Sequence, residues 1–263
     1  MEFLLHILAG AAVGFAIGLT GVGGGSLMTP LLLLFAYPAP VAIGTDLLYA
    51  AITKAGGALS HNRRGNVDWR IVALLAAGSM PVSILLHFFV IDSGFQESPG
   101  FEALLTRSLG IMLIITANIL IFRDILRQRA IEERPELLMR SLHRNRALVT
   151  WIMGLVLGVC VTLSSVGAGA FGAAILLVIY SQTTAVRIIG TDIAHAVPLT
   201  FIAGMGYLFA GYVDLELLLS LLLGSLPAIN LGSRISSQVP EKLLQKILIL
   251  LLMSLGVIYS LGL

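Results

Sequence analysis

Two aspartates, Asp46 and Asp192, are the residues of this chain whose chemistry is hardest to explain by packing alone. Each follows a Gly-Thr pair within an apolar run, where a carboxylate costs about 2.5–3.5 kcal/mol to insert into a bilayer and usually has a partner or a function. In one interpretation, the aspartates, or the hydroxyls of Thr45 and Thr191, cap a helix start or receive N–H groups from a facing loop. In the other, one or both aspartates take up and release a proton as coupling groups.

Two glycine-rich stretches interrupt apolar runs at matching places in the two halves of the chain. Thr-Gly-Val-Gly-Gly-Gly-Ser occupies Thr20–Ser26, and Ser-Ser-Val-Gly-Ala-Gly-Ala occupies Ser164–Ala170. Glycine inside a helix costs about 1 kcal/mol relative to alanine, so each cluster predicts a helix break. Non-helical backbone at membrane depth is tolerated only where protein or a wet cavity satisfies it, and such paired breaks are typical of transporters.

The two breaks offer the groups that would bind a small anion. Backbone N–H groups form an anion-binding nest, the following helix adds positive potential, and hydroxyls donate further hydrogen bonds. The alternative is close helix packing through small residues, which requires no ligand. In the second loop, Ala168 and Ala170 replace Gly24 and Ser26, so equal contact from both halves is not expected. The candidate substrate-binding residues are Thr20, Gly21, Val22, Gly23, Gly24, Gly25, Ser26, Ser164, Ser165, Gly167 and Gly169.

Three further side chains could act within the membrane. Lys54 and Arg187 are candidate counter-charges for an anion, although Lys54 could snorkel to the inner face and Arg187 could simply end a loop. His195 lies three residues after Asp192 on the same helix face, where it could relay protons or be a hydrogen-bonded core histidine. The other histidines are scattered and Cys160 is the single cysteine. We therefore expect no metal site and no cofactor.

The composition places these residues in an integral membrane protein. Of the 263 residues, 57% are hydrophobic and 11% are charged, against about 25% charged residues in soluble domains. Since a spanning helix needs about 20 residues, the second and seventh apolar segments are expected to be short helices and the other eight to span. The predicted segments are 3–20, 27–37, 41–60, 69–91, 104–123, 147–163, 168–180, 186–209, 213–230 and 243–262.

Repeated motifs indicate that the two halves arose by duplication. Three motifs recur after 146 positions (192 − 46 for the first): Ile43–Asp46 and Ile189–Asp192, Gly65–Asp68 and Gly211–Asp214, Gly78–Pro81 and Gly224–Pro227. Three matches at one spacing are far stronger evidence than any single match. Lysine and arginine place equivalent loops of the two halves on opposite sides of the membrane, which is the charge pattern of an inverted repeat.

We therefore predict an all-α integral membrane fold with two inverted repeats of about five helical segments each. Residues 1–123 form the N-terminal repeat and residues 147–263 the C-terminal repeat, with discontinuous helices at the glycine-rich breaks. The basic stretch 124–146 joins them and is expected in the cytoplasm by the positive-inside rule. Its alternative role is a contact with lipid headgroups or a partner.

The chain resembles the TauE/SafE family of sulfite and organosulfonate transporters, within the 4-toluene sulfonate uptake permease superfamily. The residues that carry the resemblance are Gly14–Gly25, Ile43–Asp46 and Gly65–Asp68, and it extends over nearly the whole chain. It implies a multi-pass secondary transporter of the inner membrane that moves a small sulfur-containing anion, such as sulfite or sulfoacetate. It further implies proton-coupled export. It also implies that the functional residues lie in the two glycine loops and the two Gly-Thr-Asp elements.

The same residues bear on two other functional classes, a channel and an enzyme. An uncoupled channel for a small anion or a neutral solute is the alternative, because the same glycines could line a pore. An enzyme is not expected, since the sequence has no metal-ligand cluster and no nucleophile with a plausible base. The expected partners are a small anionic substrate, protons as coupling ions and membrane lipid, and no nucleic acid.

Overall fold

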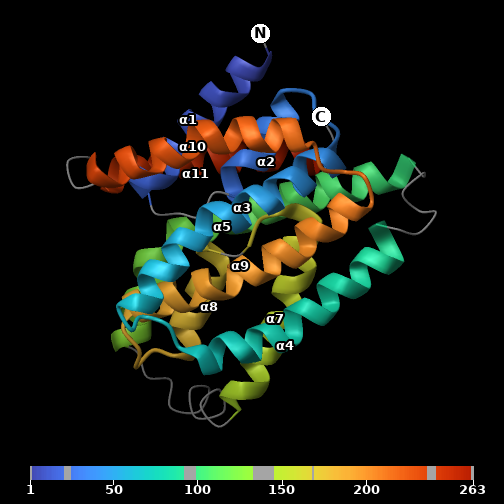
Figure 1. Cartoon of the computed structure of the whole chain (residues 1–263). Helices are drawn as coiled ribbons and strands as arrows, with labels where there is room; N and C mark the ends of the chain where they lie inside the picture. Colours follow the sequence, from blue (N-terminus) through green and yellow to red (C-terminus); the bar gives the residue numbers. More distant parts are fainter. Residues whose placement is uncertain are drawn as a thin grey trace.

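The computed structural model describes residues 2–20, 25–91, 99–132, 145–167, 169–235 and 241–261. Within these ranges the secondary structure is helical, without strands (Figure 1). The helices are α1 (Glu2–Thr20), α2 (Gly25–Leu34), α3 (Ala39–Arg63), α4 (Trp69–Leu86), the short π-helix η1 (His87–Ile91), α5 (Pro99–Glu132), α7 (Arg146–Ser164), α8 (Ala170–Ile179), α9 (Ala185–Phe209), α10 (Leu215–Ile235) and α11 (Glu241–Leu261).

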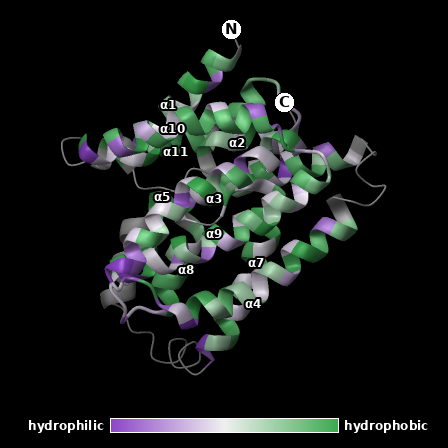
Figure 2. Cartoon of the chain, viewed as in Figure 1, coloured by the Kyte–Doolittle hydropathy of each residue, from purple (hydrophilic) through white to green (hydrophobic). Residues whose placement is uncertain are grey.

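The helices have the lengths and the apolar surface of a multi-pass integral membrane protein. Large apolar side chains such as Phe89 and Phe209 are 74% and 78% exposed, and hydrophobic residues run along the helices (Figure 2). An exposed apolar surface of this kind is stable in lipid and not in water. Five helical stretches are long and apolar enough to span a membrane: Trp69–Phe89, Gly100–Phe122, Arg146–Ser164, Ala185–Phe209 and Leu215–Ile235.

The two short helices expected from the sequence are present. α2 and α8 have 10 residues each, too few to cross a bilayer by themselves. Of the eight spans expected, α3 is absent from the five apolar candidates, and it carries both Asp46 and Lys54 in its interior. In α1 and α11 the apolar stretch is shorter than 18 residues, Phe3–Leu19 and Lys246–Leu261.

The boundary expected at residue 123 falls within a helix. α5 continues to Glu132, so that the first part of the basic stretch 124–146 extends the fifth apolar segment as one helix. α7 begins at Arg146, at the other end of that stretch. Residues 133–144 of the expected linker lie outside the described residues.

Helices of the first half pack on helices of the second half through small residues. α1 packs against α10, and α4 packs against α7. A Cβ placed on Gly14 of α1 would lie 2.6 Å from the Ser225 backbone of α10. A Cβ on Gly158 of α7 would lie 2.6 Å from the Ser79 backbone of α4. Glycine therefore lets the helix backbones touch in both pairs, as in other close-packed membrane helices.

α3 and α9 run antiparallel through the centre of the bundle (Figure 1). Their register follows from contacts at glycines, which place Gly44 beside Tyr207, Leu48 beside Gly204, Gly57 beside Ile193 and His61 beside Gly190. The middle of this run lies at Thr53 on α3 and Leu199 on α9. Asp46 and Asp192 therefore lie on opposite sides of the crossing.

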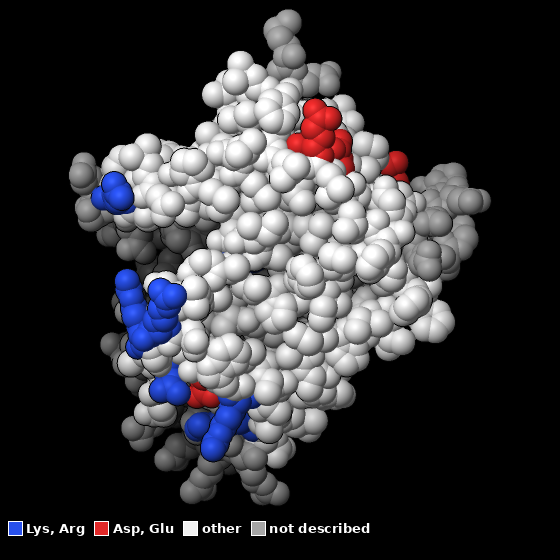
Figure 3. Space-filling view, in the orientation of Figure 1, with Lys and Arg blue, Asp and Glu red and all other residues white. Residues whose placement is uncertain are grey.

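Charges are segregated to the two ends of the molecule. The α3–α4 connection carries Arg63, Arg64 and Arg70, whereas the α9–α10 connection carries Asp214 and Glu216. Because α3 and α9 are antiparallel, these connections lie at opposite ends. On the face in Figure 3 the positive side chains gather at the left and lower left with one negative group among them, and the other negative side chains lie at the upper right. The positive-inside rule assigns the α3–α4 end to the cytoplasm.

Candidate functional site

Asp46 of α3 is buried between α2 of the first half and the end of α7 of the second half. Its exposed fraction is 0%, and the Thr29 hydroxyl of α2 donates a hydrogen bond of 2.5 Å to its Oδ2. The Ser165 hydroxyl, from the end of α7, lies beside the same carboxyl. Asp46 Oδ1 and Ser165 Oγ nevertheless have no well-formed hydrogen bond within the described part of the chain. Buried polar atoms are rarely left in this state, so the carboxyl retains the capacity to bind a further group.

Asp192 occupies the equivalent position on α9 and is 1% exposed. Its carboxyl accepts a hydrogen bond from the backbone N–H of Gly169, immediately before α8. A Cβ on Gly172 of α8 would overlap Asp192 Oδ1, so glycine is what leaves room for the carboxylate there. Oδ1 has no hydrogen-bond partner among the described residues. The carboxylate thus lies at the positively polarised start of α8.

Lys54 lies between the two aspartates. It follows Asp46 by two helical turns on α3, and its side chain is only 8% exposed, so it does not snorkel to the surface. Its ammonium group interacts electrostatically with both carboxylates, more strongly with Asp192 than with Asp46. Lys54 is therefore a buried cation with two buried carboxylates near it.

His195 extends this cluster toward α4. Its Nε2 is 2.8 Å from the Ser79 hydroxyl, and its Nδ1 has no hydrogen-bond partner among the described residues. Tyr49 is the residue 146 positions earlier, is 0% exposed, and lies beside Ser225, which is itself the counterpart of Ser79. We refer to Asp46, Lys54, Asp192 and His195, with Thr29, Ser79 and Ser165, as the polar centre.

The threonine of each Gly-Thr-Asp motif accepts a backbone hydrogen bond from a turn in the opposite half of the chain. The N–H of Asp68 donates to Thr191 Oγ1 at 2.9 Å, and the N–H of Asp214 donates to Thr45 Oγ1 at 3.3 Å. Each threonine therefore fixes the connection that precedes α4 or α10. The four residues form two clasps at opposite ends of α3 and α9.

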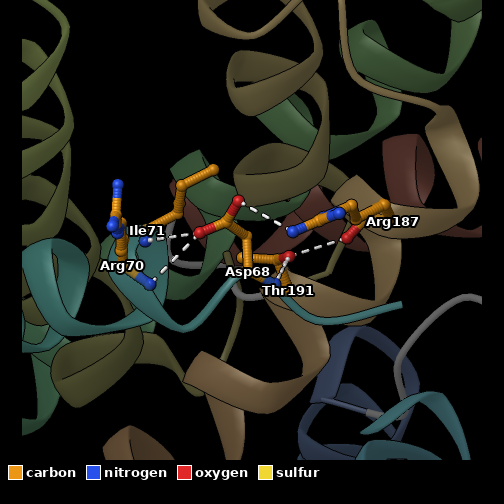
Figure 4. A network of polar contacts seen from close by, with 5 residues as sticks. All are labelled: Asp68, Arg70, Ile71, Arg187 and Thr191. Carbon is orange, nitrogen blue, oxygen red and sulfur yellow. Dashed lines mark hydrogen bonds and ion pairs between the residues drawn. The ribbon is translucent and has the colours of Figure 1, made fainter. Parts of the chain in front are cut away.

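Asp68 adds side-chain contacts to the clasp at the basic end (Figure 4). Its Oδ1 accepts hydrogen bonds from the N–H groups of Arg70 and Ile71 at 3.1 and 3.4 Å and caps α4. Its Oδ2 is 3.2 Å from Arg187 Nη2, with exposed fractions of 28% and 45% for the two side chains. The structure therefore places Arg187 in a surface ion pair and not in the polar centre.

The second glycine loop confirms the helix break predicted there. α7 ends at Ser164, and Ser165 has a left-handed backbone with φ of 57°. Gly167 and Gly169 have φ of 125° and 133°, values that other L-residues rarely adopt. The Ser164 hydroxyl donates to the Cys160 carbonyl at 2.6 Å within its own helix, so of the two serines Ser165 has the available hydroxyl.

The first glycine loop is described only at its edges. The described part of α1 ends at Thr20 and that of α2 begins at Gly25. The predicted break at Gly21, Val22, Gly23 and Gly24 lies outside the described residues, as do the side chains of Thr20, Gly25 and Ser26. Among the residues that are described, no group of three or more His, Cys, Asp or Glu side chains could hold a metal ion.

Comparisons with known proteins identify the family of the chain. The sequence matches the family "Sulfite exporter TauE/SafE" over residues 6–259. The chain belongs to the TauE/SafE family. Membership identifies it as a membrane transporter and not an enzyme, which confirms both expectations. No solved structure was found to match the chain.

Three relatives match this TauE/SafE protein along most of its length. "Probable membrane transporter protein YjnA" of Bacillus subtilis is 37% identical over 92% of this chain and 93% of its own. "Probable membrane transporter protein YdhB" of the same organism is 27% identical over 94% of this chain and 96% of its own. "Probable membrane transporter protein MJ0441" of Methanocaldococcus jannaschii is 27% identical over 92% of this chain and 90% of its own.

Several residues of the polar centre in this TauE/SafE protein were not predicted from the sequence. Ser79 and Ser225 belong to a repeated Gly-Ser-x-Pro motif, and that repetition was a signal that they share a role. Thr29 and Gly172 carry no such signal, because neither repeats at the equivalent position. Their contact with the aspartates depends on how α2 and α8 pack against α3 and α9.

Proposed function

We propose that this protein is a secondary active transporter that moves a small sulfur-containing anion across the inner membrane. The substrate class is sulfite, sulfoacetate or a related sulfonate, and the direction is proton-coupled export. The observation that carries the proposal is the polar centre: two buried carboxyl groups with unpartnered oxygens beside a buried lysine. Ionisable groups at membrane depth are costly and mark ion pathways and proton relays.

The proposed mechanism is alternating access between two inverted repeats. Its support is that contacts between the halves occur twice with the roles exchanged. The Asp68–Thr191 contact matches Asp214–Thr45, and each partner is shifted by 146 positions. A two-fold axis in the membrane plane has this effect, and it allows one repeat to rock against the other around a fixed site.

The glycine loops are proposed to supply the uncharged anion contacts. The Ser165 hydroxyl lies beside Asp46 and has no well-formed hydrogen bond within the described residues, and Gly167 and Gly169 have backbone conformations that favour glycine. N–H groups at such a loop, ahead of a helix start, bind anions well. We propose the same role for the loop before α2, on the basis of its sequence.

Asp46 and Asp192 are proposed to carry the coupling protons. Each carboxyl contacts one short helix: Asp46 accepts from the Thr29 hydroxyl of α2, and Asp192 from the N–H of Gly169 at the start of α8. Among the described residues, one oxygen on each carboxyl has no hydrogen-bond partner and can accept a proton. A movement of α2 or α8 would change the access of its aspartate to water.

Flux into proteoliposomes tests this function. Purified protein would be assayed with sulfite, sulfoacetate and thiosulfate against sulfate, with and without an imposed pH gradient. We expect flux of a sulfur anion that follows the gradient. Flux that is indifferent to the gradient would contradict coupling and indicate a channel, and flux of none of these anions would contradict the substrate class.

A further inference from the structure

We infer that Lys54 binds the transported anion directly, and that Asp192 and Asp46 hold its ammonium group between transport events. This inference rests on the proposed anion transport and adds the residue that supplies the positive charge. Among the described residues, Lys54 is the only lysine or arginine whose side chain is buried. Arg187, the other candidate counter-charge, lies at the surface on Asp68.

The position of Lys54 suits a site that must open to both sides. The contacts between α3 and α9 have their middle at Thr53 and Leu199, so Lys54 is one residue from the crossing. The equivalent residue of the second half is Thr200 (200 − 54 = 146), which is 0% exposed and lies one residue from the same middle. A charge at this point lies between the two clasps, and rocking of the repeats would expose it to each side in turn.

The charges around Lys54 explain why an anion would need to bring protons with it. The charged and titratable groups that face it are Asp46 on α3 and Asp192 and His195 on α9. With both carboxylates ionised and His195 neutral, the three charged groups sum to one negative charge. A monovalent anion alone would raise this to two negative charges in a buried site, whereas an anion that enters with one proton leaves the total unchanged.

The same arrangement gives the order of contacts during transport. Without substrate, the ammonium group interacts with both carboxylates, more strongly with Asp192 than with Asp46. A proton on that carboxyl removes its negative charge, and the ammonium group then pairs with the anion. Loss of the proton on the other side restores the carboxylate, which competes with the anion for Lys54 and favours its release. The anion and the proton therefore cross together, and export by this scheme is driven by the outward gradient of the anion.

Binding of radiolabelled sulfite to the detergent-purified chain tests this assignment. Lys54→Met should weaken sulfite binding at least tenfold, while Lys54→Arg, which keeps the charge, should retain most of it. The matched control is Lys246→Met, which removes an exposed lysine of α11 and should bind within twofold of wild type. Size-exclusion chromatography and thermal unfolding would show that each variant is folded.

Two double variants keep the test decisive if Lys54→Met does not fold. Lys54→Met with Asp192→Asn removes one charge of each sign and leaves the net charge of the cluster at one negative charge, so it should fold and still fail to bind sulfite. Lys54→Thr with Thr200→Lys moves the cation to the equivalent position and should regain at least a tenth of wild-type affinity.

The outcomes separate this inference from the proposed function. Sulfite affinity within twofold of wild type in Lys54→Met, or in the Lys54→Met and Asp192→Asn double variant, would overturn the role of Lys54 and leave anion transport standing. A wild-type chain that binds and transports none of sulfite, sulfoacetate and thiosulfate would overturn the proposed function, and the role of Lys54 with it.

Discussion

The two halves of the chain hold equivalent aspartates in different ways. Asp46 accepts a hydrogen bond from a side chain, the Thr29 hydroxyl of α2. Asp192 accepts one from the backbone, the N–H of Gly169 before α8, and its carboxyl fills the space above Gly172. The two short helices thus occupy the same place in the two halves, but one contact to the aspartate comes from a side chain and the other from the backbone.

The two halves share the contacts that pack the helices and differ in some of the side chains of the polar centre. Glycine contacts and threonine clasps occur in both halves, where the proposed rocking would require the same movement on each side of the membrane. Two titratable side chains of the polar centre have no matching residue: Tyr49 stands opposite His195 in the repeat, and Thr200 opposite Lys54. The glycine contacts, the clasps and the two aspartates proposed to carry protons are duplicated, whereas Lys54, proposed to bind the anion, is not.

The variants with the largest expected effect test whether the glycine contacts between helices are equally important in the two halves. Gly14→Val and Gly158→Val should each drive a Cβ into the backbone of the facing helix and destabilise the protein by about 3 kcal/mol. Thermal unfolding in detergent measures both. The control is Gly56→Val, whose Cβ would meet nothing within 4 Å. A loss in one variant with the other near the control would show that the two helix pairs are not equivalent.

A second variant tests the close contact between Asp192 and the glycine of α8. Gly172→Ala places a methyl group where Asp192 Oδ1 lies, so the carboxyl must move away from the start of α8. We expect gradient-driven flux to fall at least tenfold while the protein remains folded. Gly57→Ala is the control, because its Cβ would be 3.8 Å from Ile193 and in ordinary contact. Unchanged flux in Gly172→Ala would mean that the position of this carboxyl is not critical.

The clasps should give a smaller effect of similar size in both halves. Thr191→Val and Thr45→Val keep the shape of the side chain and remove the acceptor for the N–H of Asp68 or Asp214. Each should lower the free energy of unfolding by about 1–3 kcal/mol, with Thr191→Val the larger because its bond is the shorter. Chemical denaturation of the two variants beside wild type measures this. A change below about 0.5 kcal/mol in both would contradict a role for the clasps in stability.

The sequence alone predicted the helices and the second glycine break well. Apolar runs of fixed length and clusters of glycine are local signals, and the structure has a helix at each predicted segment. The positions of Asp46 and Asp192 inside apolar runs likewise singled them out. The contacts of Thr29 and Gly172 could not be predicted, because they depend on the angle at which a short helix packs.

Lys54 and Arg187 illustrate the same limit. The sequence presents both as cations near membrane depth, with no signal to separate them. The structure separates them because α3 carries Lys54 through the centre of the bundle, whereas α9 begins near Arg187 at the surface. The repeated Gly-x-Val-Asp motifs were visible, but their binding to the threonines of the opposite half follows only from the antiparallel packing of α3 and α9.

Gradient-driven flux and substrate exchange in Asp46→Asn and Asp192→Asn, measured side by side in proteoliposomes, test the central claim most directly. Asparagine keeps the size of the side chain and cannot exchange a proton at this position. If the aspartates couple anion movement to protons, gradient-driven flux should fall at least tenfold in one or both variants, while anion exchange without a gradient survives in part. Folded variants that both retain wild-type gradient-driven flux would contradict proton coupling at the polar centre.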